Sequence, residues 1–256
     1  MTQPAGRLPP WPRLVVPTVF AVAGVAVLVS LGTWQLARKA WKEALIDGIS
    51  QRLAADPAEL LPAAAWSSLD RASIEFRRVR LRAELLNDRE ALVYATGSTL
   101  RPDANGPGYW VFTPARLAGG AVVFVDRGFV PEGRQDPARR VPGQLVGMLD
   151  IVGVMRWPEL PGWFTPPDDP GRNLWFARDP VAMASAKKLG AVAPFYVEQE
   201  APVPPGGLPS PARMRINLPN DHLQYAITWY GLAAGLVAVF LVFARAQLRA
   251  DAPRGC

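Results

Sequence analysis

Two long apolar runs without a charged residue, one near each end of the chain, most constrain how this sequence can fold. The first covers residues 14–37 and the second covers residues 223–244. Each run is long enough to cross the hydrocarbon core of a bilayer as a helix, which takes about 20 residues at a rise of about 1.5 Å each. The sequence therefore predicts transmembrane helices at 14–37 and 222–244, with one extramembrane domain at 38–221 between them.

The first run also has features of a cleaved secretory signal. Basic residues precede it, and small residues stand at Ser30 and Gly32. However, the run is longer than the usual apolar region of a signal and continues past these positions to residue 37, so an uncleaved anchor is favoured.

Arginines flank the outer ends of both runs. Arg7 and Arg13 precede the first run, and three arginines follow the second. The positive-inside rule then places both tails, residues 1–13 and 245–256, in the cytoplasm and the central domain in the periplasm. Only 13 residues precede the first run, which leaves no room for a mitochondrial transit peptide, so we expect a bacterial inner membrane protein with two spans.

The composition argues against several classes of function. The net charge of +6 comes from scattered arginines rather than a basic helix, which disfavours nucleic acid as a partner and favours anionic lipid headgroups. The chain has one histidine, His222, and one cysteine, Cys256. These are too few for a Cys/His metal centre, and no nucleophile–base pair is evident, so we expect no enzyme activity.

Hydrophobic periodicity predicts the elements of the central domain. A period of three to four residues through 34–53 indicates that the first helix continues into water, whereas the period beyond residue 76 is two, which is typical of strands. A short helix is expected at 181–189, capped by Asp179 with Pro180 in its first turn. Strands are expected at 78–85, 91–96, 109–116, 121–130, 145–156, 174–177 and 194–199. The fold class is therefore an α+β membrane protein, with two terminal helices around a mainly antiparallel sheet or small barrel.

Several other side chains are expected to have structural or surface roles. Trp163 and Phe164, in a loop rich in Pro and Gly, are candidates for a surface contact. Arg127 is expected to form an ion pair at a sheet edge. Asp168 and Asp169 stand between prolines, as in a solvated turn.

Small residues on both apolar runs predict that the two membrane helices touch. Gly231 and Gly235 form a small-xxx-small step on the second helix, and Ala21 and Gly24 give the first helix a slim face. Such residues permit two helix backbones to approach closely.

The only histidine lies at the start of the second run. Asn220 or Asp221 can cap this helix, so His222 falls in its first turn. At about 100° per residue, Tyr225 and Trp229 lie within about 60° of His222 on the same face. An imidazole beside an aromatic wall suits axial ligation of a haem, but an ordinary interfacial histidine in an aromatic belt would have the same neighbours. Both interpretations remain open on these residues alone.

Seven segments in collinear order together resemble a known family. They are LGTWQL at 31–36, RRVRL at 77–81, GPGYWVFTP at 106–114, VDRGFVP at 125–131, NLWFARD at 173–179, PFYVE at 194–198 and NLPNDHLQYAITWYG at 217–231. This set is similar to the surfeit-locus family of cytochrome c oxidase assembly factors, over nearly the whole chain. Asp126 and Asp221 depart from the pattern, since the family shows Asn at these places.

The resemblance implies a non-enzymatic factor that helps to build haem–copper oxidases of the aa3 type. Its cofactor would be haem a, and its partners would be oxidase subunit I, haem a synthase and the lipid bilayer. The family histidine corresponding to His222 is the proposed ligand of the haem iron, with Tyr225 and Trp229 beside the ring. Arg213 and Arg215 could meet the haem propionates, although contact with lipid headgroups is the commoner role of such arginines. The alternative is a membrane scaffold that stabilises an assembly intermediate of subunit I without binding haem.

Overall fold

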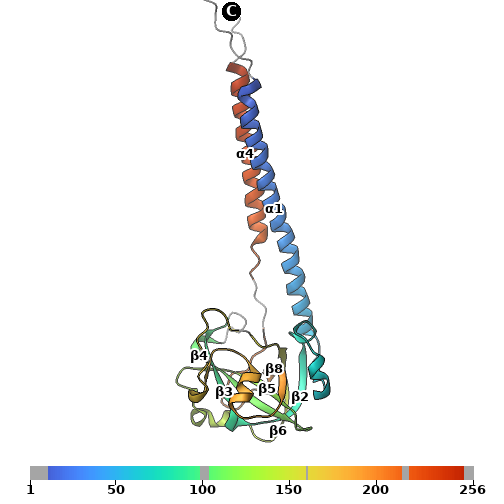
Figure 1. Cartoon of the computed structure of the whole chain (residues 1–256), viewed down its shortest axis with the longest axis vertical. Helices are drawn as coiled ribbons and strands as arrows, with labels where there is room; N and C mark the ends of the chain where they lie inside the picture. The colour runs from blue at the N-terminus through green and yellow to red at the C-terminus, as the bar shows by residue number, and fades with distance from the viewer. Residues whose placement is uncertain (1–10, 99–103, 160, 215–218, 251–256) are drawn as a thin grey trace, which may run out of the picture. The chain divides into compact units, whose positions relative to one another are not determined.

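A computed structural model describes residues 11–98, 104–159, 161–214 and 219–250 (Figure 1). The chain divides into a unit that holds most of two long helices, Met1–Ile46 and Leu218–Cys256, and a compact β-rich unit, Asp47–Asn217, which includes the end of the first helix. This architecture confirms the fold class predicted from the sequence, in which two terminal apolar helices flank an α+β domain.

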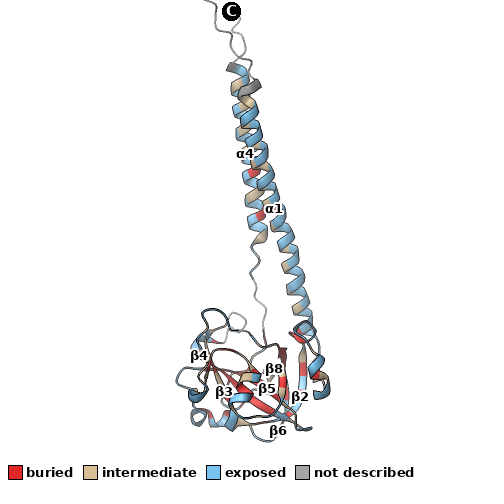
Figure 2. Ribbon diagram, in the orientation of Figure 1, coloured by how far each residue is buried: buried red, intermediate tan, exposed pale blue. Residues whose placement is uncertain are grey.

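The two long helices are α1 (Trp11–Ala54) and α4 (His222–Ala250), and both are long and apolar enough to cross a membrane. Helix α1 continues through the segment predicted at 34–53, as expected. The helix already includes Trp11, so Pro17 lies inside it. Most side chains of both helices are exposed (Figure 2), an arrangement that suits apolar surroundings.

The helices pack against each other in antiparallel directions. Gly24 of α1 faces Leu236 of α4, while Gly32, further along α1, faces Tyr230, which is earlier in α4. A Cβ atom added to either glycine would lie only 2.9 Å from the facing side chain. Both glycines therefore make room for a large side chain, and the predicted contact at Gly24 is confirmed.

The predicted role of the second helix's glycines is wrong. A Cβ atom added to Gly231 or Gly235 would meet no atom within 4 Å, so these residues do not face α1. The small residues of α4 that are buried are Ala226 and Ala233, seven residues or two helical turns apart.

The β-rich unit is built on one eight-stranded sheet, in the order β1-β2-β6-β8-β5-β4-β3-β7. A further pairing of β2 with β4 closes the five strands β2, β6, β8, β5 and β4 into a barrel. Strand β5 runs parallel to β8, and the other neighbours in the ring are antiparallel. The strands are β1 (Ala58–Glu59), β2 (Arg78–Leu85), β3 (Ala91–Gly97), β4 (Asn105–Leu117), β5 (Val122–Pro131), β6 (Met148–Arg156), β7 (Leu174–Trp175) and β8 (Val192–Ala201).

Alternation in strand β2 explains which side of the barrel wall is buried. The residues Val79, Leu81, Ala83 and Leu85 are buried, whereas the charged residues between them are not. The buried residues join a core cluster that includes Ile74. The predicted half-buried strand is therefore confirmed, because a period of two places every second side chain on the inner face.

Local signals in the sequence account for the turns of the domain. Strands β4 and β5 form the expected hairpin across Gly119 and Gly120. In β6, a Cβ atom on Gly153 would overlap the Glu198 carbonyl, and the register with β8 shifts at this point, as expected for a bulge. Helix α3 (Pro180–Ala186) begins where predicted, with the Asp179 carboxylate accepting two backbone N–H bonds, but it ends earlier than expected.

The structure adds short elements that periodicity did not predict. These are β1, helix α2 (Arg71–Ile74) and the 3-10 turns η1 (Ala63–Ser68), η2 (Asn87–Arg89), η3 (Pro137–Gly143) and η4 (Pro170–Arg172). Each is too short to show a period. Strand β1 adds an edge strand to the sheet beside β2, and η2 and η3 line a cavity described below.

Candidate functional site

His222 is the first residue of helix α4 and is half-buried. Its ring nitrogen Nδ1 lies 2.8 Å from the amide oxygen Oε1 of Gln35 in α1. The other ring nitrogen, Nε2, has no hydrogen-bond partner among the described residues. One ring nitrogen of the histidine therefore contacts the neighbouring helix, and the other makes no hydrogen bond within the part of the chain that the structure describes.

Contacts on either side of this pair fix the register of the two helices. The hydroxyl groups of Thr33 and Tyr230 lie 3.0 Å apart, within hydrogen-bonding distance. On the other side, the Lys42 ammonium donates to the backbone carbonyl of Pro219. Gln35 lies between Thr33 and Lys42 in α1, so the site is bracketed by interhelical contacts.

The predicted aromatic neighbours occupy different surroundings. Helical geometry puts Trp229 about 20° and Tyr225 about 60° to one side of His222, while the buried Ala226 lies about 40° to the other side. In agreement, Trp229 is half-buried near the α1 contact, and Tyr225 is 56% exposed. Among the described residues, neither aromatic side chain forms a hydrogen bond with His222, and their role beside a haem stays a prediction.

The two arginines proposed for propionate binding are placed differently. Arg213 belongs to the β-rich unit, where its Nε atom lies 3.9 Å from the Glu200 carboxylate and its Nη2 atom donates to the Leu53 carbonyl. An arriving carboxylate would have to compete with Glu200. Arg215 lies outside the described residues.

Arg127 does not occupy the sheet edge that was expected. It is 1% exposed, in strand β5, which lies between β8 and β4 inside the sheet. Its guanidinium donates to the Asn87 side chain at 3.0 Å and to the Gly143 carbonyl. Burial lowers the pKa of Arg127 to about 10. Its role is to hold η2 and η3 against the barrel.

The loop residues behave as the sequence suggested. Asp168 and Asp169 order a turn, the first by accepting the Phe176 backbone N–H at 2.6 Å and the second by pairing with Arg172. Trp163 is 101% exposed and the adjacent Phe164 99% exposed, so both are available for contact with another molecule.

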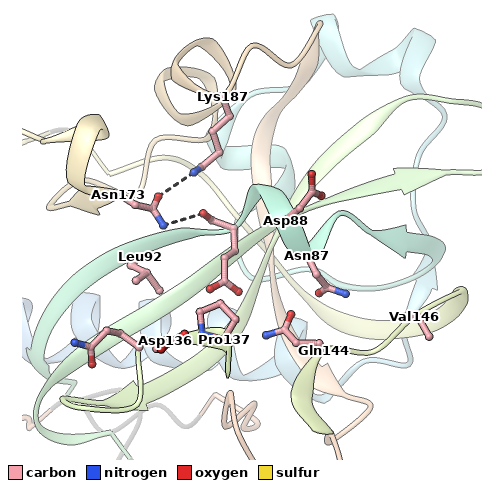
Figure 3. A pocket seen from close by; sticks show the side chains of 11 residues that line it. Asn87, Asp88, Leu92, Asp136, Pro137, Gln144, Val146, Asn173 and Lys187 are labelled. Carbon is pink, nitrogen blue, oxygen red and sulfur yellow. Dashed lines mark hydrogen bonds between the residues drawn. The ribbon is translucent and has the colours of Figure 1, made fainter. Parts of the chain in front are cut away.

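A cavity of about 760 Å³, lined mostly by polar residues, opens in the β-rich unit, and the sequence did not indicate it. Its walls come from η2, the start of η3, the segment before β6 and the end of α3 (Figure 3). Lys187 donates to the Asn173 side chain at its rim, and burial lowers the pKa of Lys187. Asp88, Glu90 and Asp136 also line it, so charges of both signs share the space.

A buried ionic group lies elsewhere in the same unit. Arg156 donates to the Glu75 carboxylate at 3.0 Å and to the Glu198 carboxylate at 3.2 Å. Glu75 also accepts the Trp157 backbone N–H at 2.8 Å. These bonds join α2, β6 and β8, and they indicate a structural role.

Comparisons with known proteins cover most of the chain. The sequence model of a family described as the SURF1 family matches residues 22–234. The chain is 35% identical over 259 residues to a SURF1-like protein of Monosiga brevicollis, spanning 95% of this chain and 92% of that protein. It is 35% identical over 221 residues to Surfeit locus protein 1 of Rattus norvegicus, spanning 82% and 69%, and 33% identical over 215 residues to Surfeit locus protein 1 of Homo sapiens, spanning 80% and 69%.

Proposed function

Because the chain belongs to the SURF1 family, we propose that it is a non-enzymatic assembly factor for haem–copper cytochrome c oxidases of the aa3 type. In this proposal it binds haem a and helps its insertion into oxidase subunit I, acting after haem a synthase. The observation that carries the proposal is the sole histidine, His222, at the start of α4 with one ring nitrogen bonded to α1 and the other without a partner among the described residues.

The donor set is compatible with a haem. Neutral imidazole is a common axial ligand of haem iron, and the porphyrin is a flat apolar ring that suits aromatic and aliphatic neighbours. His222 would hold the iron, and the exposed Tyr225 and half-buried Trp229 would lie along the ring. Bound haem would supply the redox centre of the oxidase, and this chain would supply its orientation during transfer.

Purified protein from cells that make haem a tests this function. We expect the wild-type chain to carry the visible bands of haem a and His222→Ala to lose them while remaining in the membrane. His222→Met should keep weakened binding at a raised reduction potential, since a thioether is also an axial ligand. Gln224→Ala, an exposed neighbour about 200° around the helix, is the control and should keep the bands.

A scaffold that never holds haem is the second candidate. The fully exposed pair of Trp163 and Phe164 favours it, since exposed aromatic anchors are typical of protein contact sites. If His222→Ala supports normal oxidase assembly and purifies with undiminished haem, the scaffold takes the place of the haem carrier.

We further propose that the chain lies in a bacterial inner membrane, with both tails in the cytoplasm and the β-rich unit in the periplasm. Two antiparallel helices of membrane length support a hairpin topology, and Arg245 and Arg249 follow the second span. Alkaline phosphatase inserted after Gly120, in the β4–β5 turn, should be active. A stable but inactive fusion would contradict this topology.

A further inference from the structure

We infer that Gln35 is a positioning residue for His222, which keeps the proton on Nδ1 so that the lone pair of Nε2 is free to bind iron. The inference rests on the proposed function, because it assigns the atom of His222 that would meet the haem. It concerns a residue of α1 that is 187 positions away in the sequence.

The chemistry of the contact sets the direction of the hydrogen bond. The atom of Gln35 that lies 2.8 Å from Nδ1 is the amide oxygen Oε1, which can only accept. Nδ1 must therefore donate. A neutral imidazole carries one proton, so a proton on Nδ1 leaves Nε2 unprotonated with its lone pair available. Metal-ligating histidines generally donate their other N–H to such an acceptor, which fixes both the tautomer and the ring orientation.

The place of His222 in the helix makes this bond consequential. As the first residue of α4 it has no preceding helical turn to restrain its side chain. Gln35, by contrast, lies within the long helix α1, and the nearby Thr33–Tyr230 contact holds the two helices in register. The hydrogen bond to Gln35 therefore restrains the orientation of the His222 ring.

Rotation of the Gln35 amide by half a turn would move the ring proton of His222 to the other nitrogen. The amide nitrogen would then donate to Nδ1, the ring proton would move to Nε2, and the nitrogen available for iron would be blocked. The orientation of one amide therefore selects the ligand atom, and the two arrangements differ in a property that can be measured without haem.

Nitrogen NMR of the haem-free chain provides that measurement. His222 is the only histidine, so full-length protein labelled with ¹⁵N-histidine in lipid nanodiscs gives the signals of this ring alone. At a pH where the ring is neutral, we expect a protonated Nδ1 and an unprotonated Nε2. Gln35→Glu keeps an oxygen acceptor and should preserve this tautomer, whereas Gln35→Leu should yield a mixture of both tautomers.

Thr18→Val is the matched control on the same helix. It removes the hydrogen bond from the Thr18 hydroxyl to the Leu14 carbonyl within α1 but leaves the acceptor of His222 and the Thr33–Tyr230 contact in place, so the tautomer should stay as in the wild type. A wild-type ring protonated on Nε2, or a Gln35→Leu spectrum identical to that of the wild type, would overturn the inference.

The haem-loaded chain separates this inference from the proposed function. Loss of an orienting partner typically weakens metal binding by about 10–100-fold, so Gln35→Leu should retain haem that much less tightly. Gln35→Glu should lower the reduction potential, because a carboxylate makes the imidazole a more basic ligand. If the wild type carries no haem a, the proposed function fails while the tautomer result stands. If the wild type binds haem through His222 and Gln35→Leu matches it in affinity and potential, only the positioning role fails.

Discussion

Replacement of Arg156 by glutamine should destabilise the β-rich unit far more than the same replacement of Arg71, although both arginines pair with Glu75. The Arg156 side chain is 7% exposed and lies between the carboxylates of Glu75 and Glu198. The Arg71 side chain is 64% exposed, and its Nε atom lies 3.8 Å from Glu75. The two variants therefore compare a buried and an exposed ion pair on one carboxylate.

The expected magnitudes follow from the burial of the groups that lose their partner. Arg156→Gln leaves Glu75 and Glu198 close together and buried, and breaking such a pair costs about 3–5 kcal/mol. Arg178 is close enough to Glu198 to stabilise the charge of that carboxylate. The expected loss in the free energy of unfolding is therefore at the lower end of this range, about 3 kcal/mol. Burial alone would lower the pKa of Arg156, but neighbouring negative groups including Glu198 and Glu75 outweigh it and raise that pKa. Arg71→Gln removes an exposed pair worth about 0–1 kcal/mol.

Thermal unfolding of the full chain in detergent, followed by near-ultraviolet circular dichroism, measures the difference. For a unit of this size, 1 kcal/mol shifts Tm by about 2–4 °C. We therefore expect Arg156→Gln to lower Tm by about 6–12 °C and Arg71→Gln by less than about 4 °C. Equal shifts for the two variants, or a Tm of Arg156→Gln within about 2 °C of the wild type, would refute the reasoning.

Three further predictions concern other parts of the chain. Gly32→Ala should weaken the helix pair by about 1–3 kcal/mol through overpacking, whereas Gly231→Ala, which meets no neighbour, should be neutral or stabilising; the yield of a disulfide between cysteines placed at positions 24 and 236 reports both. Trp163→Ala and Phe164→Ala should change the unfolding free energy by less than about 0.5 kcal/mol, because both side chains are exposed; a larger loss would mean that they pack in the chain. Burial raises the pKa of Tyr196 from 10.0 to about 12, so stability that is fully present below pH 10 should fall as the pH rises through about 12, and Tyr196→Phe should remove this loss in alkaline denaturation.

Periodicity predicted the strands but left open whether the sheet closes into a barrel. Alternation fixed β2 because Val79 and Leu81 face one side and the charged residues between them face the other. The pairing of β2 with β4, and the parallel pairing of β5 with β8, join segments far apart in the chain, and no local pattern specifies such partners. Arg127 was wrongly expected at a sheet edge because arginine side chains are rarely buried. Strand β5, which carries it, is buried along nearly its whole length.

Of the two residues that meet in the candidate site, only His222 could be predicted from the sequence. His222 stood out because it is the sole histidine and begins an apolar helix. Gln35 stands in the LGTWQL segment that resembles the family, but no local pattern linked it to His222, because its partner is 187 positions away. The cavity beside Lys187 was missed for a similar reason, because short turns, a strand and a helix end converge on it from distant parts of the sequence.

The helix pair shows why a motif of small residues misidentified the contact face of α4. A small-xxx-small step permits two backbones to approach when both helices present small residues. Here α1 supplies the space, through Gly24 and Gly32, and α4 fills it with the side chains of Leu236 and Tyr230. This asymmetric packing leaves Tyr230 able to bond Thr33 of α1, a contact that a pair of facing glycines could not make. The glycines of α1 therefore hold the register in which Gln35 meets His222.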